Sequence, residues 1–405
     1  MLNLKKFSAK KILIVILLLT AFLRLFRLDF PNKFIFDEVY HAFTAKEFLA
    51  GHKEAWEWWT TPPPGVAYEW THPPLAKEIM AVSMFTFHSG DGWAWRLPGT
   101  LLGILSVYLV YLIAINLFKN QNVALISAFV FSIDGLNFVQ SRIGMNDIYY
   151  VTFTLASLFL LLNKKFAFSA IFFGLALSSK WAAIYFSLLI FITLFLNKDF
   201  KKLIYFIIIP PLIYLLSYTP FFIHGHTIDQ FIGLQKQMWW YHTNLSATHS
   251  YSSPWWSWPI NLYPIWYFVD YQKDFMANIF ASGNPAVFLP GLIAVILTTF
   301  EALKRRSKKL LLIILGFFIF WLPWALSPRI MFLYHYSPSI PFLSLVLGYK
   351  LNQILDYKNG RQIVLILMIL MMTSFLFIFP FITGIHIPKY LVNLFFLTNI
   401  TKNPF

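Results

Sequence analysis

Residues 11–41 read KILIVILLLTAFLRLFRLDFPNKFIFDEVYH, an apolar run that ends a few residues before two adjacent carboxylates, Asp37 and Glu38. As a helix, the run is long enough to cross about 30 Å of hydrocarbon. It contains Arg24 and Arg27 and lacks a small-residue cleavage site. We therefore expect a retained membrane anchor followed by an acidic pair, rather than a signal peptide.

More apolar runs of similar kind follow, although those between residues 123 and 197 are short and closely spaced. The sequence therefore predicts an all-α polytopic membrane protein with about 11 transmembrane helices in a single domain, residues 1–405. The predicted spans cover residues 11–28, 97–118, 123–140, 147–162, 166–182, 183–197, 203–219, 284–302, 310–326, 333–350 and 362–384.

The composition agrees with a membrane protein. Hydrophobic residues make up 58% of the 405 residues and charged residues 12%, against roughly 25% charged in soluble domains. A soluble enzyme and a disordered chain are both excluded. The chain has no cysteine, which excludes disulfides and cysteine-ligated metals.

The net charge of +15 is interpreted as a topology signal, because Lys and Arg accumulate in cytoplasmic loops. Lys5, Lys6, Lys10 and Lys11 precede the first span, and an N-terminus inside makes the short basic connectors cytoplasmic. Two long connectors, 29–96 and 220–283, are then extracytoplasmic. The basic character implies no nucleic-acid partner.

Both long connectors are rich in tryptophan, including Trp255 and Trp256. Tryptophan is favoured at the headgroup level of a bilayer, so interfacial belts are one interpretation. The other is a roof over a cavity, which we favour because His, Asp and Arg are clustered in the same loops.

Polar residues recur where these loops meet the predicted spans. Of Asp37 and Glu38, one is expected to act as general base or cation ligand and the other to position a partner, the alternative being solvated surface charges. Guanidinium and ammonium groups at one membrane face suit a lipid-linked phosphate. The further candidates are His72, Lys77, Arg96, Gln140, Arg142, Asp147, Lys180, His249, Arg329 and His335.

A metal site is not expected. His224 and His226, with His242 and His249 downstream, have an unspecific spacing for zinc. No phosphate-binding loop or nucleotide fingerprint is present, so a nucleotide-sugar site is not expected either.

Taken in order, the motifs of this sequence resemble those of protein O-mannosyltransferases of the prokaryotic kind. The match extends along essentially the whole chain. The motifs are Asp37-Glu38, the His-Pro-Pro-Leu-x-Lys run from His72 to Lys77, Arg96, Gln140-Ser141-Arg142, Lys180-Trp181, Ser-Pro-Trp-Trp-Ser-Trp-Pro at 253–259, and Arg329 with Tyr334-His335-Tyr336-Ser337-Pro338.

The resemblance implies a GT-C fold with a cytoplasmic N-terminus and a catalytic acid in the first outer loop. It implies a polyprenyl-phosphate mannose donor, no cofactor, and Ser/Thr acceptors in secreted or membrane polypeptides that meet the enzyme at the Sec translocon. The plasma membrane of a bacterium or archaeon is the expected location. The connector 220–283 is too short for the MIR domain of eukaryotic members.

By the same resemblance, Asp37 is the base, Glu38 orients acceptor or base, and four cations stabilise the departing phosphate. Gln140 completes the donor site, while His72, Asp147, His249 and His335 contact donor or acceptor or serve in structural hydrogen bonds. The four cations are Arg96, Arg142, Lys180 and Arg329.

Two alternatives stay open at this point. A GT-C transferase that modifies lipid A with aminoarabinose would share the fold and the lipid phosphate. A transporter or flippase would also have many spans. Its site must be reachable from both membrane faces, whereas the polar motifs of this sequence are predicted on one face.

Overall fold

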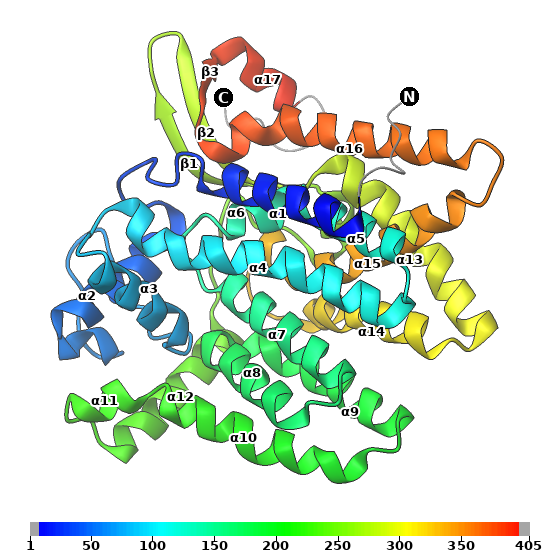
Figure 1. The fold of residues 1–405 in the computed structure, drawn as a ribbon. Helices are drawn as coiled ribbons and strands as arrows, with labels where there is room; N and C mark the ends of the chain where they lie inside the picture. The colour runs from blue at the N-terminus through cyan, green and yellow to red at the C-terminus, as the bar shows by residue number, and fades with distance from the viewer. Residues whose placement is uncertain (1–7, 397–405) are drawn as a thin grey trace.

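The structure is a computed structural model that describes residues 8–396, and each predicted apolar run coincides with a helix in it (Figure 1). The helices are α1 (Ala9–Leu25), α2 (His41–Ala50), α3 (Leu75–Thr86), α4 (Gly92–Phe118), α5 (Gln121–Ser132), α6 (Gly135–Gln140), α7 (Asp147–Leu162), α8 (Phe166–Ser179), α9 (Phe186–Leu196), α10 (Leu203–Leu216), α11 (Thr219–Ile223), α12 (Ile228–Asn244), α13 (Pro285–Arg305), α14 (Lys308–Trp321), α15 (Ile340–Ile354), α16 (Gly360–Thr383) and α17 (Lys389–Phe396).

The centre of the bundle is built by successive helix pairs. Helix α4 packs against α5 and α7, α7 packs against α8, and α8 packs against α10. Helix α15, far along the chain, packs against α5 and closes the bundle. The buried faces are mainly apolar, with small hydroxyl side chains such as Thr152, Ser157 and Ser169 among them, which fits helices that pack closely inside a membrane.

The predicted span 123–140 is divided in two. Helix α5 ends at Ser132, and the Asp134 carboxylate accepts hydrogen bonds from the backbone N–H groups of Leu136 and Asn137 at the start of α6. An acid inside an apolar run is costly unless it is hydrogen-bonded, and capping a helix N-terminus satisfies it. The break thus follows from Asp134.

Within the described residues, four helical segments are long and apolar enough to cross a membrane by length and composition alone. They are Gly92–Phe118, Pro285–Arg305, Lys308–Leu326 and Gly360–Thr383. Several other apolar helices are shorter, so the count of about 11 spans stays a prediction.

The prediction of an all-α chain missed a small sheet. Strands β1 (Ile265–Tyr271) and β2 (Phe275–Ala281) form an antiparallel hairpin, and β3 (His386–Pro388) pairs antiparallel with β2. The hairpin lies in the second long connector. It carries Tyr267, which stacks on Phe36 of the first connector with ring centroids 4.1 Å apart, so the sheet joins the two connectors.

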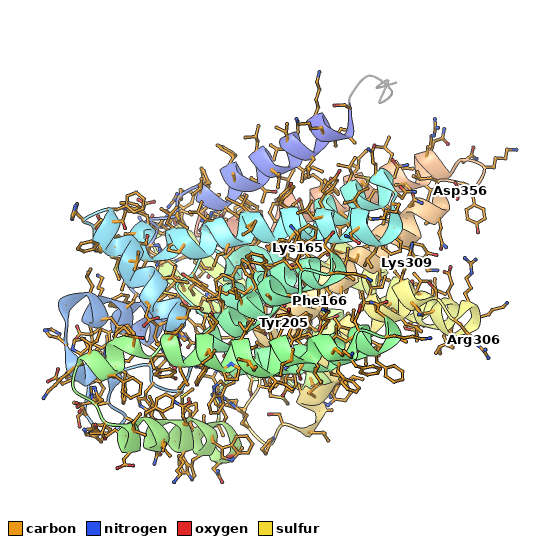
Figure 2. The ribbon with its side chains drawn as sticks, turned by 60° about the horizontal axis from the view of Figure 1, so that its bottom comes forward. Lys165, Phe166, Tyr205, Arg306, Lys309 and Asp356 are labelled. Carbon is orange, nitrogen blue, oxygen red and sulfur yellow. The ribbon has the colours of Figure 1, made fainter. Side chains whose placement is uncertain are left out.

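Helices of the two long connectors and residues of the later basic connectors lie at opposite ends of the bundle. Figure 1 shows α2, α3, α11 and α12 together at one end of the molecule. Figure 2 shows Arg306, Lys309 and Asp356, from basic connectors, at the opposite end. Lys5 and Lys6, which also entered the charge argument, lie outside the described residues.

The absence of native cysteine makes the orientation testable by single-cysteine labelling. We expect a membrane-impermeant maleimide added to intact cells to label Trp256→Cys, which replaces a 53% exposed side chain, and not Arg306→Cys. Permeabilised cells should label both. Labelling of Arg306→Cys in intact cells would reject the orientation.

Candidate active site

The Glu38 carboxylate is fully buried and fully hydrogen-bonded. Arg96 donates to both of its oxygens, through Nε and Nη2 at 2.7 Å each. The Trp95 indole and the backbone N–H groups of Ile35 and Gly144 complete the shell at 2.8–3.1 Å. Glu38 therefore has no free position with which to orient an acceptor.

Arg96 is equally saturated. Its remaining N–H groups donate to the carbonyl oxygens of Leu28, Pro31 and Lys33, and the residue is 1% exposed. All five N–H donors of the guanidinium are thus used within the protein. The expected role of Arg96 in binding a phosphate is not supported: the residue holds the end of α1 and the acidic turn together.

Asp37, the neighbour of Glu38, is in the opposite situation. The residue is partly exposed, and its carboxylate has no hydrogen-bond partner among the described residues. Burial, with the negative charge of Glu69, raises the pKa of Asp37 to about 7, although Lys180 and Arg329 act in the other direction. A carboxylate with such a pKa can accept a proton near neutral pH.

The backbone that presents Asp37 is conformationally unusual. Phe36 has φ of 47°, in the left-handed region that bulky residues rarely adopt. Its ring stacks on Tyr267 and meets Tyr334 edge-on, with centroids 6.3 Å apart. The aromatic packing holds the strained turn, and such strain is concentrated at functional sites.

Lys180 and Asp147 form a buried ion pair beside Asp37. Their Nζ and Oδ1 atoms are 2.9 Å apart, and the ammonium lies 5.4 Å from the centroid of the Tyr334 ring. Asp147 Oδ2 has no partner among the described residues. The pair leaves two of the three N–H donors of Lys180 available to an anion.

Arg329 is held by His242. The His242 Nε2–H donates to the Thr71 carbonyl at 2.8 Å, so its Nδ1 can accept a hydrogen bond from Arg329 Nη1. Arg329 also lies over the Tyr241 ring, and its buried Nε has no partner within the described chain. Burial, followed by the charge of Arg329, lowers the pKa of His242 to about 4.

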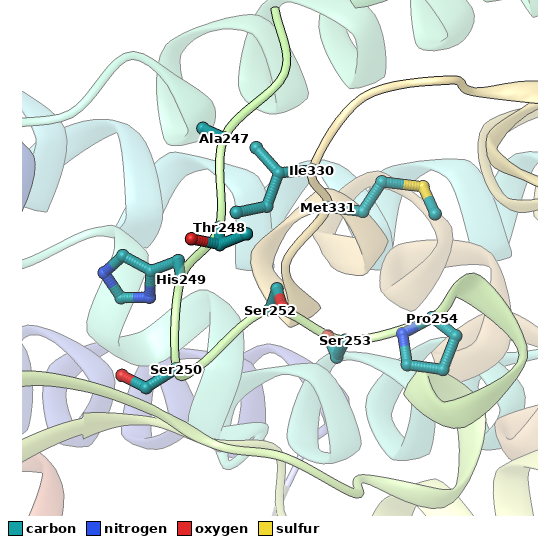
Figure 3. Close-up of a pocket in the computed structure, with 9 residues that line it drawn as sticks. All are labelled: Ala247, Thr248, His249, Ser250, Ser252, Ser253, Pro254, Ile330 and Met331. Carbon is teal, nitrogen blue, oxygen red and sulfur yellow. The ribbon is translucent and has the colours of Figure 1, made fainter.

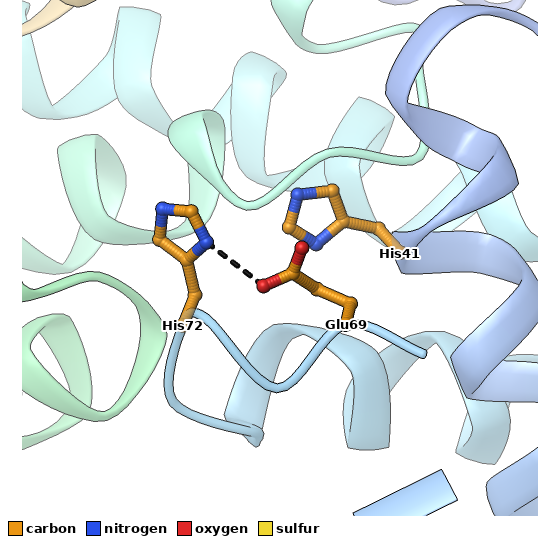
Figure 4. A group of neighbouring side chains, drawn as sticks. All are labelled: His41, Glu69 and His72. Carbon is orange, nitrogen blue, oxygen red and sulfur yellow. Dashed lines mark hydrogen bonds and ion pairs between the residues drawn. The ribbon is translucent and has the colours of Figure 1, made fainter. Parts of the chain in front are cut away.

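His72 and Lys77 belong to a second group with His41 and Glu69; Figure 4 shows His41, Glu69 and His72. The Nδ1–H of His72 donates to Glu69 Oε1 at 3.0 Å, and Lys77 donates to the carbonyls of Glu69 and His72. Burial lowers the pKa of His72 to about 3, so the imidazole is neutral. Burial opposes ionisation of Glu69, but His72, His41 and Lys77 outweigh it and keep its pKa low.

Two other expected donor-site residues, Arg142 and Gln140, bond to other parts of the protein. Arg142 donates to the carbonyls of Leu23 and Arg24 at the end of α1, and no described contact joins it to Arg329 or Asp37. Gln140 accepts from Tyr267 at 3.3 Å, and its buried amide nitrogen is unpartnered among the described residues.

His335 is buried inside an aromatic stack. Its Nδ1 lies 2.9 Å from the Phe332 carbonyl, and its ring stacks on Trp258 and Tyr334. No described contact joins His335 to Asp37 or Arg329, so these contacts fit the structural hydrogen bond that was the alternative to a site role.

His249 lines a hollow of about 550 Å³ between residues 247–254 and the chain around Ile330 and Met331 (Figure 3). Nearby, Trp255 packs against Trp321, whereas Trp256 is exposed. Ile330 and Met331, which line the hollow, directly follow Arg329 in the sequence.

The histidines weighed as zinc ligands from the sequence are dispersed. His226 bonds to Glu57 at 3.2 Å, His242 to Thr71 and Arg329, and His249 to the Tyr251 backbone N–H. The grouping that does occur is His41, Glu69 and His72. Of these, Glu69 and the role of His41 were missed, because neither has a characteristic spacing. The available signal is their position, since Glu69 lies just before the His-Pro-Pro run and His41 just after the acidic pair.

The chain matches two described protein families. Residues 14–228 match the family described as dolichyl-phosphate-mannose-protein mannosyltransferase, and residues 227–397 match the C-terminal four TMM region of protein-O-mannosyltransferase. The polyprenol-phosphate-mannose–protein mannosyltransferase of Mycolicibacterium smegmatis is 25% identical over 94% of this chain and 90% of its own length. That of Mycobacterium tuberculosis is 24% identical over 93% and 88%.

Solved structures share the fold. The S. cerevisiae protein O-mannosyltransferase Pmt1–Pmt2 complex bound to the sugar donor superposes with a TM-score of 0.79 at 16% identity, over 99% of this chain and 94% of that chain. ArnT from Cupriavidus metallidurans gives 0.61 at 14% identity, over 89% and 63%. The expected GT-C fold is confirmed. Since the first family match alone spans more than half of the sequence, the chain belongs to the dolichyl-phosphate-mannose-protein mannosyltransferase family of membrane glycosyltransferases.

Proposed function

We propose that this protein transfers mannose from a polyprenyl-phosphate donor to Ser or Thr hydroxyl groups of polypeptides on the extracytoplasmic face of the membrane. Family membership and the names of the mycobacterial relatives support the donor and the protein acceptor. They favour this activity over aminoarabinose transfer to lipid A and over transport. The bundle end that carries α2, α3 and α12 is the proposed outer face (Figure 1).

The observation that carries the proposal is the contrast between the two adjacent acids. Glu38 is saturated by Arg96, Trp95 and backbone donors. Asp37 is a partly exposed residue whose carboxylate has no partner within the described chain and has a pKa of about 7. Of the pair, only Asp37 is free to take a proton from an acceptor hydroxyl.

In the proposed mechanism, the acceptor hydroxyl gives its proton to Asp37 as its oxygen attacks the anomeric carbon of the donor. The bond to the phosphate oxygen breaks, and the phosphate leaves with an added negative charge. Arg329 and Lys180 stabilise that charge, because both lie near enough to influence Asp37 and both have unused N–H donors. Direct displacement inverts the anomeric centre, from a β-linked donor to an α-linked product.

The activity is tested by incubating purified protein in lipid nanodiscs with polyprenyl-phosphate mannose and a peptide that contains Ser and Thr. Mass spectrometry should find a hexose on the peptide, and fragmentation should locate it on a hydroxyl side chain. A peptide that carries only Ala at those positions is the control. Unmodified peptide under conditions where the donor is bound would reject the proposed acceptor.

The first prediction from this mechanism concerns Arg329. Lysine keeps the positive charge but loses the planar, two-donor geometry and the stacking on Tyr241. We expect Arg329→Lys to raise the KM for the donor about tenfold, the equivalent of one lost charged hydrogen bond. Steady-state kinetics measure this, with Arg306→Lys at the opposite end of the bundle as the matched control. Equal donor KM values for both variants would remove Arg329 from the phosphate site.

The second prediction concerns pH. Because the base must be ionised and its pKa is raised to about 7, kcat/KM should fall about tenfold per pH unit below that value and level off above it. The loss occurs on the acidic side, since protonation removes the lone pair that accepts the proton. A pH profile measured between about 5 and 9 with saturating peptide tests this; a flat profile would contradict it.

A further inference from the structure

Three potential metal ligands come together beside the proposed base without belonging to the proposed catalytic step. His41 is the first residue of α2, whereas Glu69 and His72 lie in the segment that leads into α3. One ligand atom from each of the three lies within 4.8 Å of the others. Figure 4 shows the Glu69 carboxylate between the two imidazole rings.

One of these side chains has an unmet polar atom that is deeply buried. His41 is 3% exposed, and its Nδ1 has no hydrogen-bond partner among the described residues. A buried ring nitrogen without a partner destabilises the folded protein unless its lone pair or its N–H group finds a partner. The neighbouring groups that could do so are the carboxylate of Glu69 and an ion bound with it.

The surroundings of Glu69 fit a carboxylate that serves as a ligand. The Thr71 hydroxyl donates a hydrogen bond to Glu69 Oε1 at 2.6 Å, and such a bond fixes the orientation of a ligating carboxylate. Lys77 bonds to the backbone carbonyls of Glu69 and His72 and forms no ion pair with the carboxylate itself. The carboxylate is therefore not neutralised by a direct contact with the lysine ammonium.

We propose that His41, Glu69 and His72 form a binding site for one divalent transition metal ion of the zinc class. Two imidazoles and one carboxylate are a donor set that zinc accepts with a fourth position open to water or substrate. Oxygen-preferring ions such as Mg²⁺ and Ca²⁺ fit this set poorly. The ion would join α2 to the segment before α3, next to Asp37.

The geometry requires a modest contraction. Zn–N and Zn–O bonds of about 2.0–2.2 Å in a tetrahedron put neighbouring ligand atoms about 3.3 Å apart. The three ligand atoms now lie up to 4.8 Å apart. The longest of these distances must therefore shorten by up to about 1.5 Å, which side-chain rotation can supply. His72 would also lose the proton that it now donates to Glu69, because metal binding displaces protons from its ligands.

The test measures binding and is independent of the transferase activity. Full-length protein in detergent is stripped with EDTA, dialysed and titrated with ZnCl₂ by isothermal titration calorimetry. We expect one zinc per chain, and at least about tenfold weaker binding in each of His41→Ala, Glu69→Gln and His72→Ala. The matched control is His226→Ala, which breaks another buried His–Glu contact, 3.2 Å from Glu57, and should bind zinc as the wild type does.

A second measurement covers the case in which a variant fails to fold. X-ray absorption at the zinc edge of the wild-type protein should report two imidazole ligands and one carboxylate at about 2.0–2.2 Å. Absence of stoichiometric binding to the wild type, unchanged affinity in the three variants, or a first shell without imidazole would each overturn the proposal. Because none of these readouts requires mannose transfer, they would leave the proposed function standing.

Discussion

Asp37→Asn is expected to abolish transfer of mannose to Ser and Thr while leaving the protein folded and able to bind its lipid donor. Asparagine keeps the shape of the side chain but cannot accept a proton, and loss of a general base costs about 10²–10⁴ in rate. Little change in stability is expected, since the Asp37 carboxylate makes no hydrogen bond within the described residues. Turnover with peptide, donor binding and the thermal midpoint should be measured on the same preparation.

The matched control is Asp91→Asn. Asp91 lies in the same outer connector, but its side chain is bonded to Asn32 and Ser89 outside the site, so this variant should keep full activity. Near-normal turnover of Asp37→Asn would show that another group takes the proton, and the proposed mechanism would then be wrong.

The helices were predictable because apolar runs of sufficient length allow little else in a membrane. The sheet was not, because IWYFVDY and FMANIFA are short and apolar on both faces inside an aromatic loop. Its third strand, His386–Pro388, comes from more than a hundred residues further along the chain. Such pairing depends on tertiary contacts that local patterns do not encode.

The sequence motifs predicted only part of the site. The acidic pair was found, but two adjacent acids do not reveal which one has protein partners. Arg96 was assigned to a phosphate because guanidinium groups at one membrane face suit that anion, whereas in the structure it pairs with Glu38. Glu69 was missed because it has no motif of its own, and the contact of His242 with Arg329 was missed because it joins segments distant in the sequence.

The largest effect on stability is expected from Glu38→Gln. A residue that only orients the acceptor or the base would impair transfer mildly when changed to an amide. The structure predicts a different outcome, because Arg96 would keep a buried positive charge at 1% exposure without its counter-ion. Removing one partner of such a pair costs about 3–5 kcal/mol, and the amide would also turn a donor toward Arg96 or the Gly144 N–H.

Thermal unfolding in detergent, followed by tryptophan fluorescence, should therefore show a lower midpoint for Glu38→Gln and for Arg96→Met. The double variant Glu38→Met with Arg96→Met should recover part of the loss, because replacing a buried pair by apolar groups removes both desolvation costs. Activity should fall in proportion to the folded fraction, whereas Asp37→Asn should lose activity at full stability. Unfolding midpoints equal to that of the wild type in both single variants would contradict the inference that the Glu38–Arg96 pair stabilises the turn that carries Asp37.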